Sequence, residues 1–350
     1  MTSPHQLATE ELLDLVEQLP HLKHGKYIQR ALEAIIRMAG EEIDRLDWKI
    51  LTASMEDMEK AFTTFYPYRH IRKITIFGSA RTDVNSAQYE AAVEFARRIT
   101  EIGFMVLTGA GGGIMQAGNE GAGRQHSFGL NIKLPFEQSA NPYIEGDAKL
   151  IDFKYFFTRK LFFLRESDAV ALFPGGFGTQ DEAFETLTLS QTGRYGPCPL
   201  VLIDEPGGDY WKTWQEQIKD NLHQRGLISP DDIHLYTITD DIEIACEVVK
   251  HFYRVYHSSR FVGQMYVMRL NYPLSDGQID ELNEEFADLM VTGKIERTKA
   301  LPQEQGDKTE KLPRLIFNFD QQNYGRLYQL IGAINSMQIE ESMTEHPEIK

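Results

Sequence analysis

Short apolar runs alternate with amphipathic helical segments between Ile71 and Tyr256. The runs that read as strands are Ile71–Phe77, Phe104–Thr108, Ser127–Leu134, Ala169–Phe173 and Pro199–Ile203. The segments with helical spacing are Tyr89–Ile102, Ile114–Gly123, Phe153–Glu166, Thr179–Gln191 and Tyr210–Arg225. This alternation predicts a Rossmann-like α/β fold, a parallel sheet with helices on both faces and right-handed crossovers. Ligands bind such sheets beyond the carboxyl ends of the strands.

The pattern differs on both sides of this region. Before it, helical spacing is found in Leu12–Leu19, which Pro20 ends, in Tyr27–Ala39 and in Glu41–Phe65. After it, a β-α-β-β-α order of the ferredoxin-like kind is expected from Val262–Asn271, Asp276–Leu289, Lys294–Lys299, Arg314–Phe319 and Tyr324–Asn335. The polar connection Pro302–Lys311 is expected to be mobile. We therefore predict three parts: a helical extension over 1–68, a Rossmann-like domain over 69–257 and a small α+β module over 258–350.

Composition and charge narrow the class of protein. Of the 350 residues, 42% are hydrophobic and 25% are charged, which is typical of a soluble globular protein. No apolar run approaches the roughly 20 residues of a membrane helix, and the polar start does not resemble a signal peptide, so a cytoplasmic protein is expected. The net charge of −16 disfavours nucleic-acid polymers as partners, and without a membrane-length apolar run no membrane association is expected. Cys198 and Cys246 fit no metal or redox spacing and are expected to be buried, inert thiols.

The first glycine run, Gly109-Ala-Gly-Gly-Gly113, follows a predicted strand and opens a helix. A dinucleotide fingerprint would need glycine where Ile114 stands, and no Gly-Lys-Ser/Thr follows, so neither NAD nor a Walker A phosphate site is expected. What remains is a glycine turn at a helix start, whose free N–H groups attract an anion. The alternative is a tight turn without a ligand.

The second run, Pro174-Gly-Gly-Phe-Gly-Thr-Gln-Asp-Glu182, also joins a buried strand to a helix. Its glycines allow close approach of a phosphate, Thr179 can donate to it, and Glu182 and Glu185 share roughly one helix face. A carboxylate beside a phosphate is costly unless a cation accompanies it or it does chemistry. The alternative for Glu182 is an acidic residue that favours the helix dipole.

Arg159 is the candidate cation. It lies in the apolar segment Phe156-Phe-Thr-Arg-Lys-Leu-Phe-Phe163, where a charge needs a partner or a ligand. The alternative is a structural salt bridge. Lys160 is expected to point elsewhere on the helix, toward solvent.

Together these motifs resemble the LOG ("lonely guy") family, over roughly residues 70 to 255. They are Gly78-Ser79-Ala80, Thr108-Gly-Ala-Gly-Gly-Gly-Ile-Met115, Arg159-Lys160 and the Pro174–Glu182 run, in the family's order and spacing. The family includes cytokinin phosphoribohydrolases and nucleotide 5′-monophosphate nucleosidases, and many members carry the label "lysine decarboxylase". The resemblance implies that Arg159 and Glu182 are catalytic. It implies that substrate and phosphate are held by Ser79, Gly111, Gly112, Gly113, Gly175, Gly176, Gly178, Thr179 and Glu185.

The sequence thus predicts hydrolysis of the N-glycosidic bond of nucleoside 5′-monophosphates, such as AMP, to free base and ribose 5-phosphate. No metal or cofactor is expected. The alternatives are a cytokinin riboside 5′-monophosphate phosphoribohydrolase and a non-catalytic carrier of a nucleotide or of molybdenum cofactor. The segment Phe156-Phe-Thr158, where small cytokinin-activating members usually carry a Met-His-Glu-like lead, departs from the first alternative. A pyridoxal-phosphate decarboxylase is rejected, because no Schiff-base lysine context is recognisable. The resemblance also implies a homodimer or higher homo-oligomer, and the C-terminal module is a candidate site for a nucleotide effector.

Overall fold

The computed structural model describes residues 18–132 and 139–339. The chain divides into two compact units, Met1–Glu56 and Asp57–Lys350. The first unit holds a short 3-10 turn, η1 (Leu19–His21), then α2 (Gly25–Ala39) and the start of α3 (Arg45–Phe65). The two later helices predicted for this region are thus confirmed, although α3 begins at Arg45 rather than Glu41. Most of the helix predicted over Leu12–Leu19 lies outside the described residues.

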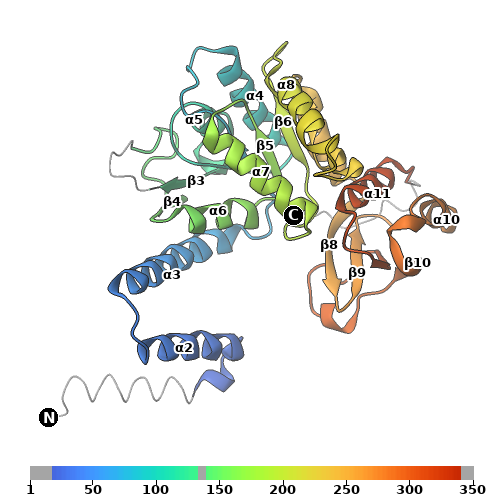
Figure 1. The fold of residues 1–350 in the computed structure, drawn as a ribbon, viewed down its shortest axis with the longest axis horizontal. Helices are drawn as coiled ribbons and strands as arrows, with labels where there is room; N and C mark the ends of the chain where they lie inside the picture. The colour runs from blue at the N-terminus through green and yellow to red at the C-terminus, as the bar shows by residue number, and fades with distance from the viewer. Residues whose placement is uncertain (1–17, 133–138, 340–350) are drawn as a thin grey trace. The chain divides into compact units, whose positions relative to one another are not determined.

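Within the described residues, the central sheet of the second unit has seven parallel strands (Figure 1). Their order across the sheet is β4-β3-β2-β1-β5-β6-β7. Their bounds are β1 (Lys73–Phe77), β2 (Met105–Thr108), β3 (Ser127–Ile132), β4 (Leu150–Phe153), β5 (Ala169–Leu172), β6 (Leu200–Ile203) and β7 (Thr237–Thr239). The order of connection reverses between β1 and β5, which is the position where such sheets bind ligands.

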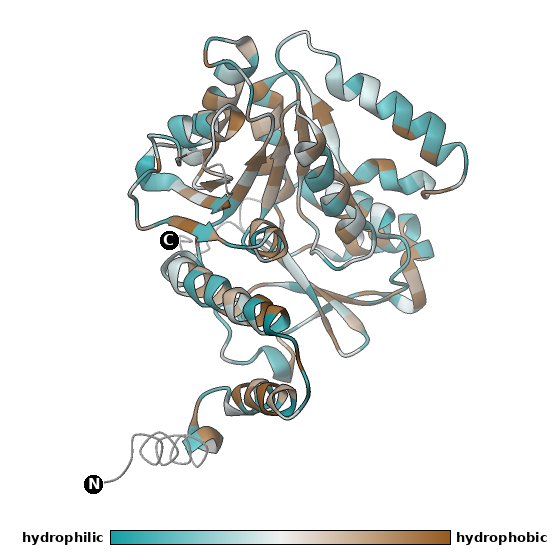
Figure 2. Ribbon diagram, turned by 60° about the vertical axis from the view of Figure 1, so that its left-hand side comes forward, coloured by the Kyte–Doolittle hydropathy of each residue, from teal (hydrophilic) through white to brown (hydrophobic). Residues whose placement is uncertain are grey.

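Helices cover both faces of this sheet and confirm the predicted α/β fold. They are α4 (Ala87–Glu101), α5 (Ile114–Ala122), α6 (Phe156–Arg165), α7 (Phe177–Gln191), α8 (Tyr210–Ile218) and α9 (Ile242–Phe252). Alternate residues of β1 enter opposite cores: Ile74 and Ile76 pack with α4, α5 and α9, whereas Phe77 packs with α3, α6 and α8. Figure 2 shows the result, with hydrophobic strands at the centre of the domain and hydrophilic outer helix surfaces.

Sequence reasoning missed three elements of this domain. The strand β7 has only three residues, and β4, with the sequence Leu-Ile-Asp-Phe, lacks the continuous apolar run of the predicted four-residue strands. The helix α9, capped by the Asp241 side chain, was also missed. Because Phe153 belongs to β4, the helix expected from Phe153 begins instead at Phe156, after an extended Tyr155.

The C-terminal part forms a four-stranded antiparallel sheet in the order β10-β11-β9-β8. Its elements are β8 (Tyr256–Val262), β9 (Met265–Leu270), α10 (Asp276–Glu285), β10 (Met290–Thr298), β11 (Arg314–Phe319) and α11 (Tyr324–Ser336). The run from β9 to α11 has the predicted β-α-β-β-α order. The single strand expected over Val262–Asn271 is a hairpin, because Gly263, with φ of 63°, allows a tight turn there. We propose to keep 69–257 as the α/β domain and 258–350 as the C-terminal module.

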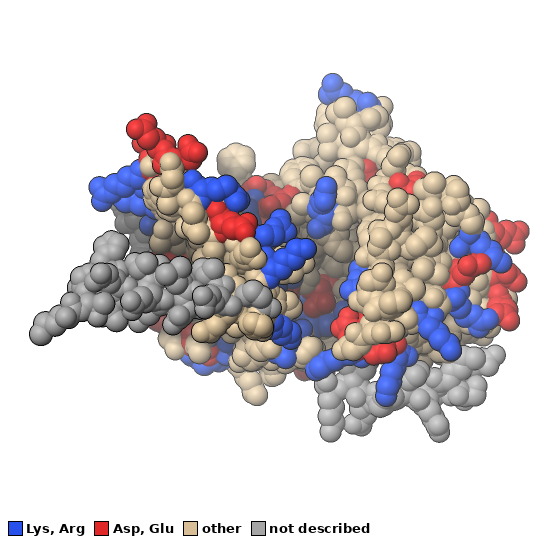
Figure 3. Space-filling model, turned by 90° about the horizontal axis from the view of Figure 1, so that it is seen from below, with Lys and Arg blue, Asp and Glu red and all other residues tan. Residues whose placement is uncertain are grey.

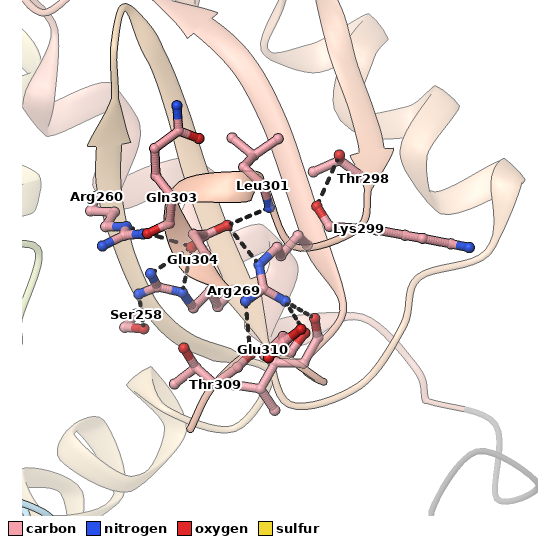
Figure 4. A network of polar contacts seen from close by, with 12 residues as sticks. Ser258, Arg260, Arg269, Thr298, Lys299, Leu301, Gln303, Glu304, Thr309 and Glu310 are labelled. Atoms are coloured by element: carbon pink, nitrogen blue, oxygen red, sulfur yellow. Dashed lines mark hydrogen bonds and ion pairs between the residues drawn. The ribbon is translucent and has the colours of Figure 1, made fainter. Parts of the chain in front are cut away.

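The connection between β10 and β11 is anchored, contrary to the expectation of a mobile linker. We call residues 299–313 the strap. Glu304 of the strap is 1% exposed and binds Arg269 of β9 and Arg314 of β11, with Oε1 2.6 Å from Arg269 Nη2 and Oε2 3.1 Å from Arg314 Nε (Figure 4). Arg260 of β8 lies beside the same carboxylate. A polar composition did not reveal that one carboxylate would be buried among three arginines.

Charged side chains of both signs lie on the face of the molecule drawn in Figure 3. On the face drawn in Figure 3, Lys and Arg side chains are interspersed with Asp and Glu rather than gathered into one basic tract. Among the described helices, none is long and apolar enough to cross a membrane. Both cysteines are buried, as predicted, and burial raises the pKa of each thiol to about 12.

Candidate functional site

The loops that follow β1, β2 and β5 are bonded to one another at the carboxyl edge of the sheet. The Ser79 amide donates to the Pro174 carbonyl oxygen at 3.2 Å, which joins the loops after β1 and β5. The Ile114 amide donates to the Ser79 carbonyl oxygen at 3.0 Å, which joins the loops after β1 and β2. The structure therefore brings together the three glycine-containing segments that the sequence singled out.

The loop after β2 is held by a buried amide network that sequence reasoning missed. Ala110 has a φ of 63°, which costs a non-glycine residue roughly 1–2 kcal/mol. Its N–H donates to Thr108 Oγ1 at 3.1 Å, and its carbonyl oxygen accepts from the Asn141 amide at 2.8 Å. The Oδ1 atom of Asn119 accepts from both the Thr108 hydroxyl and the Asn141 side chain. These bonds fix the loop in a conformation that its own backbone preference would not select.

The glycines of the two runs fall into two groups. At four of them a Cβ atom would come too close to a neighbouring group: 2.2 Å from Ser79 O at Gly113, 2.1 Å from Thr179 Oγ1 at Gly175, 2.3 Å from Arg159 Nη2 at Gly109, and 2.7 Å from Met115 Cε at Gly111. Gly113 and Gly175 need glycine for packing, because backbone atoms of the loop after β1 lie within 3 Å of the Cβ position, whereas at Gly109 and Gly111 the nearest atoms are the ends of flexible side chains. At Gly176 and Gly178 a Cβ atom would meet nothing within 4 Å, and at Gly112 only the Ala80 carbonyl oxygen at 3.5 Å. For this open group, packing supplies no reason for glycine, whereas the approach of a ligand does.

The helix α7 presents its N-terminus at this edge. It begins at Phe177 with Gly176 as N-cap, two residues before the predicted start, so the amides of Phe177, Gly178 and Thr179 form its first turn. First-turn amides have no partner within a helix and carry a partial positive charge. The loop before them is held by Tyr210, whose hydroxyl donates to the Gly175 carbonyl oxygen at 2.6 Å. This arrangement suits an anion such as a phosphate.

Glu182 is buried in the second turn of α7, with 9% of its surface exposed. Its Oε2 atom has no hydrogen-bond partner among the described residues. Burial, opposed by Lys160 and reinforced by Glu185, raises the pKa of Glu182 to about 7. The helix has no acidic residue in its first turn, so a simple interaction with the helix dipole does not explain Glu182. A buried carboxyl group with an unpartnered oxygen and a pKa near neutral is typical of a catalytic site.

Arg159 enters the site from α6. Its Nε atom donates to the Leu130 carbonyl oxygen at 2.7 Å and Nη2 donates to the Gly109 carbonyl oxygen at 3.3 Å, so the guanidinium lies against the first glycine run. Burial lowers the pKa of Arg159 to about 10, opposed by the charge of Glu182. It therefore keeps its charge at neutral pH. Among the described residues, carbonyl oxygens hold its guanidinium, rather than the structural salt bridge considered as an alternative.

Asp57 of α3, which sequence reasoning passed over, anchors the start of α6. Its Oδ2 atom accepts hydrogen bonds from the Lys154 amide at 3.1 Å and from the Thr158 hydroxyl at 2.7 Å. The carboxylate is 6% exposed. An acidic side chain at a helix N-terminus satisfies free amides and favours the dipole. Asp57 thus fixes the turn that carries Arg159.

The prediction for Lys160 was wrong. Its ammonium lies 2.7 Å from Asp181 Oδ2 and 2.7 Å from Glu185 Oε2, and only 19% of its side chain is exposed. Glu185, predicted to contact substrate, is engaged in this ion pair. Two carboxylates on the facing helix α7 attract the ammonium more strongly than solvent does at this partly buried position. In residues 18–132 and 139–339 there is no group of three or more His, Cys, Asp or Glu side chains that could hold a metal ion.

Part of the α/β domain is similar to a described family and to several curated proteins. Residues 113–249 match the family model described as "Possible lysine decarboxylase". Cytokinin riboside 5′-monophosphate phosphoribohydrolase LOG3 of Arabidopsis thaliana is 26% identical over 164 residues, which cover 45% of this chain and 73% of the relative. The corresponding enzyme LOG of Oryza sativa subsp. japonica is 28% identical over 139 residues, which cover 38% of this chain and 56% of the relative. These matches bear out the family resemblance.

Solved structures match a similar share of the chain. The molybdenum cofactor binding protein of Rippkaea orientalis covers 51% of it at 20% identity, with a TM-score of 0.36. The molybdenum cofactor carrier protein of Chlamydomonas reinhardtii covers the same share at 21% identity, also with a TM-score of 0.36.

Proposed function

Because the α/β domain is related to the LOG family, we propose that this protein hydrolyses the N-glycosidic bond of nucleoside 5′-monophosphates. The products are a free base and ribose 5-phosphate. The supporting observation is the pairing of two features at one edge of the sheet: glycine loops open to a phosphate, and a buried Glu182 with an unpartnered carboxylate oxygen. A phosphate site alone would fit a carrier equally well. A carrier, however, has no need for a carboxyl group beside the phosphate, and burying such a group costs free energy.

The proposed reaction breaks the bond between C1′ of the ribose and the base nitrogen, through a state with oxocarbenium character. The Glu182 carboxylate stabilises that positive charge and accepts a proton from the attacking water, whose oxygen forms the new bond to C1′. The base leaves with the electron pair of the broken bond and is protonated. A pKa of about 7 suits a group that must accept and release a proton near neutral pH.

Binding energy from the phosphate fixes the ribose over Glu182. The first-turn amides of α7 and the open glycines Gly176 and Gly178 hold the phosphate, and Ser79 and Thr179 add hydroxyl donors. Arg159 orients the substrate from α6, and the carbonyl oxygens of Leu130 and Gly109 hold its guanidinium against the first glycine run. Phosphate contacts remote from the reacting bond can in this way support catalysis.

We further propose that the protein acts as a homodimer or higher homo-oligomer in the cytoplasm. Large apolar side chains of α6 and α7 are exposed beside the site: Phe156, Phe157, Leu161, Phe177 and Phe184. Phe177, in the glycine run itself, is 96% exposed. Such a cluster is typical of a surface that another protein covers. Binding of a nucleotide effector by the C-terminal module stays a prediction.

The proposal is tested by incubating the purified protein with AMP, GMP, CMP, UMP and isopentenyl-AMP and following free base by chromatography. We expect release from one or more of the unmodified nucleotides. Preference for isopentenyl-AMP over AMP would instead favour a cytokinin phosphoribohydrolase.

The matched variant is Glu182→Gln, which keeps the size of the side chain and removes its charge. We expect it to abolish base release while AMP binding, measured by calorimetry, is retained. Full activity of the variant would contradict the role of Glu182. Tight AMP binding without base release by the unaltered protein would point to a carrier.

A further inference from the structure

Three carboxylates occupy two successive turns of α7, and one lysine of α6 faces them. Asp181 and Glu185 are spaced i, i+4 on the helix, an arrangement that is destabilising when both are charged and unpaired. Lys160 bridges them, with its Nζ atom at 2.7 Å from each carboxylate. Glu182 lies next to Asp181 in sequence and one turn before Glu185, so the bridge encloses the residue that the proposed reaction needs.

The bridge also determines the electrostatic surroundings of Glu182. The charged groups that act on it are Lys160 and Arg159 from α6 and Asp181 and Glu185 from α7. Burial and the two neighbouring carboxylates all disfavour the negative charge of Glu182. Of the two cations, Lys160 opposes this effect more strongly than Arg159 does. Arg159 is instead directed at the glycine loop, where two carbonyl oxygens hold it.

We propose that Lys160 is a positioning residue for the reaction: by binding Asp181 and Glu185 it holds the Glu182 turn of α7 in place and lets Glu182 carry its charge beside them. This inference rests on the proposed function of Glu182. Lys160 then has a role different from that of its neighbour Arg159, which is proposed to orient the substrate. Lys160 touches two carboxylates and no described group of the phosphate loops, so it acts through α7.

The competing explanation is that Lys160 only ties α6 to α7. Loss of a structural tie would lower the melting temperature and reduce activity equally at every pH. Loss of a positioning charge would move the pH at which Glu182 ionises, because the carboxylates of Asp181 and Glu185 would no longer be neutralised. The pH profile of kcat therefore separates the two roles.

The experiment compares Lys160→Gln with Lys160→Arg, which keeps the charge, and with Lys149→Gln as control. Lys149 forms an ion pair of the same 2.7 Å length with Asp147 in another loop. For Lys160→Gln we expect the acid limb of the kcat profile to move upward by about one pH unit, with KM for AMP changed less than about threefold. Lys160→Arg should restore the profile, and Lys149→Gln should leave it unmoved.

A double variant and a direct titration complete the test. Adding Asp181→Asn to Lys160→Gln removes one of the repelling charges and should move the profile part of the way back. The ionisation of Glu182 is followed independently by carboxyl carbon NMR. An unmoved titration in Lys160→Gln, with a lower melting temperature, would overturn the proposal. If the unaltered protein releases no base, the proposed function fails, and the NMR titration still decides whether Lys160 controls the charge of Glu182.

Discussion

The hydroxyl group of Tyr328 on α11 makes two hydrogen bonds to the backbone of Cys198, which precedes β6. It accepts from the Cys198 amide and donates to the Cys198 carbonyl oxygen, both at 3.1 Å. Nearby, a Cβ atom on Gly193, just beyond the end of α7, would lie 1.9 Å from the Tyr324 hydroxyl oxygen. The C-terminal module thus packs through α11 against the far end of the helix that carries Glu182.

We expect Tyr328→Phe to destabilise the protein by about 1–3 kcal/mol, because it leaves a buried amide and a buried carbonyl group of Cys198 without their partner. The free energy of unfolding would be measured by urea titration. Tyr27→Phe, at a side chain that is 68% exposed, is the matched control and should change nothing. Equal stability of the two variants would show that this contact does not hold the module in place.

The raised pKa of Glu182 implies that this buried carboxyl group weakens the fold at alkaline pH. Burial shifts its pKa from 4.5 to about 7, so between these values the folded state binds more protons than the unfolded state, and stability falls as pH rises. Glu182→Gln has no such proton to lose. We expect it to be more stable than the unaltered protein at pH 8, by about 1–3 kcal/mol at roughly 1.4 kcal/mol per pKa unit.

The same comparison at about pH 5 should show little or no advantage, since the carboxyl group is then protonated in the folded state. Thermal unfolding at the two pH values measures the difference. Glu284→Gln, on the exposed part of α10, controls for general loss of negative charge. A Glu182→Gln variant that is less stable than the unaltered protein at pH 8 would contradict the raised pKa.

The sequence predicted the strands and helices around the glycine runs because long apolar periodicities and glycine punctuation occur together there. It singled out Arg159 and Glu182 as candidate site residues, through the resemblance and through the rarity of charges in apolar helices. It could not place Lys160, because the direction of its side chain depends on a facing helix distant in sequence. The same reason applies to Asp57, Asn119 and Asn141, whose partners are set by tertiary packing. The polar composition of the strap led to a wrong prediction of mobility. Composition could not reveal that Glu304 would be buried and would hold the strap in place.

In the strap, substitution of one residue far from the glycine loops is expected to lower the stability of the protein strongly. Glu304→Ala leaves Arg269 and Arg314, which are 7% and 2% exposed, without their carboxylate. We expect a loss of about 3–5 kcal/mol in the free energy of unfolding, the usual cost of breaking one partner out of a buried ion pair. Chemical denaturation measures it, with Glu296→Ala on the exposed side of β10 as control. A loss no larger than the control would mean that the strap is held by other contacts shown in Figure 4.

Substitution by alanine is expected to affect stability in one group of glycines and substrate binding in the other. Gly113 has a φ of 60° and would place a Cβ atom 2.2 Å from the Ser79 carbonyl oxygen, so Gly113→Ala should lower stability by about 2 kcal/mol or more. Gly176, with a φ of −85° and open space around it, should accept alanine without loss of stability.

If the open space at Gly176 serves a phosphate, Gly176→Ala should instead raise KM for AMP by about tenfold or more, since a methyl group displaces the ligand from the first-turn amides of α7. Ribose 5-phosphate binding by calorimetry separates this effect from contacts to the base. An unchanged KM in a stable Gly176→Ala protein would place the phosphate elsewhere along the sheet edge.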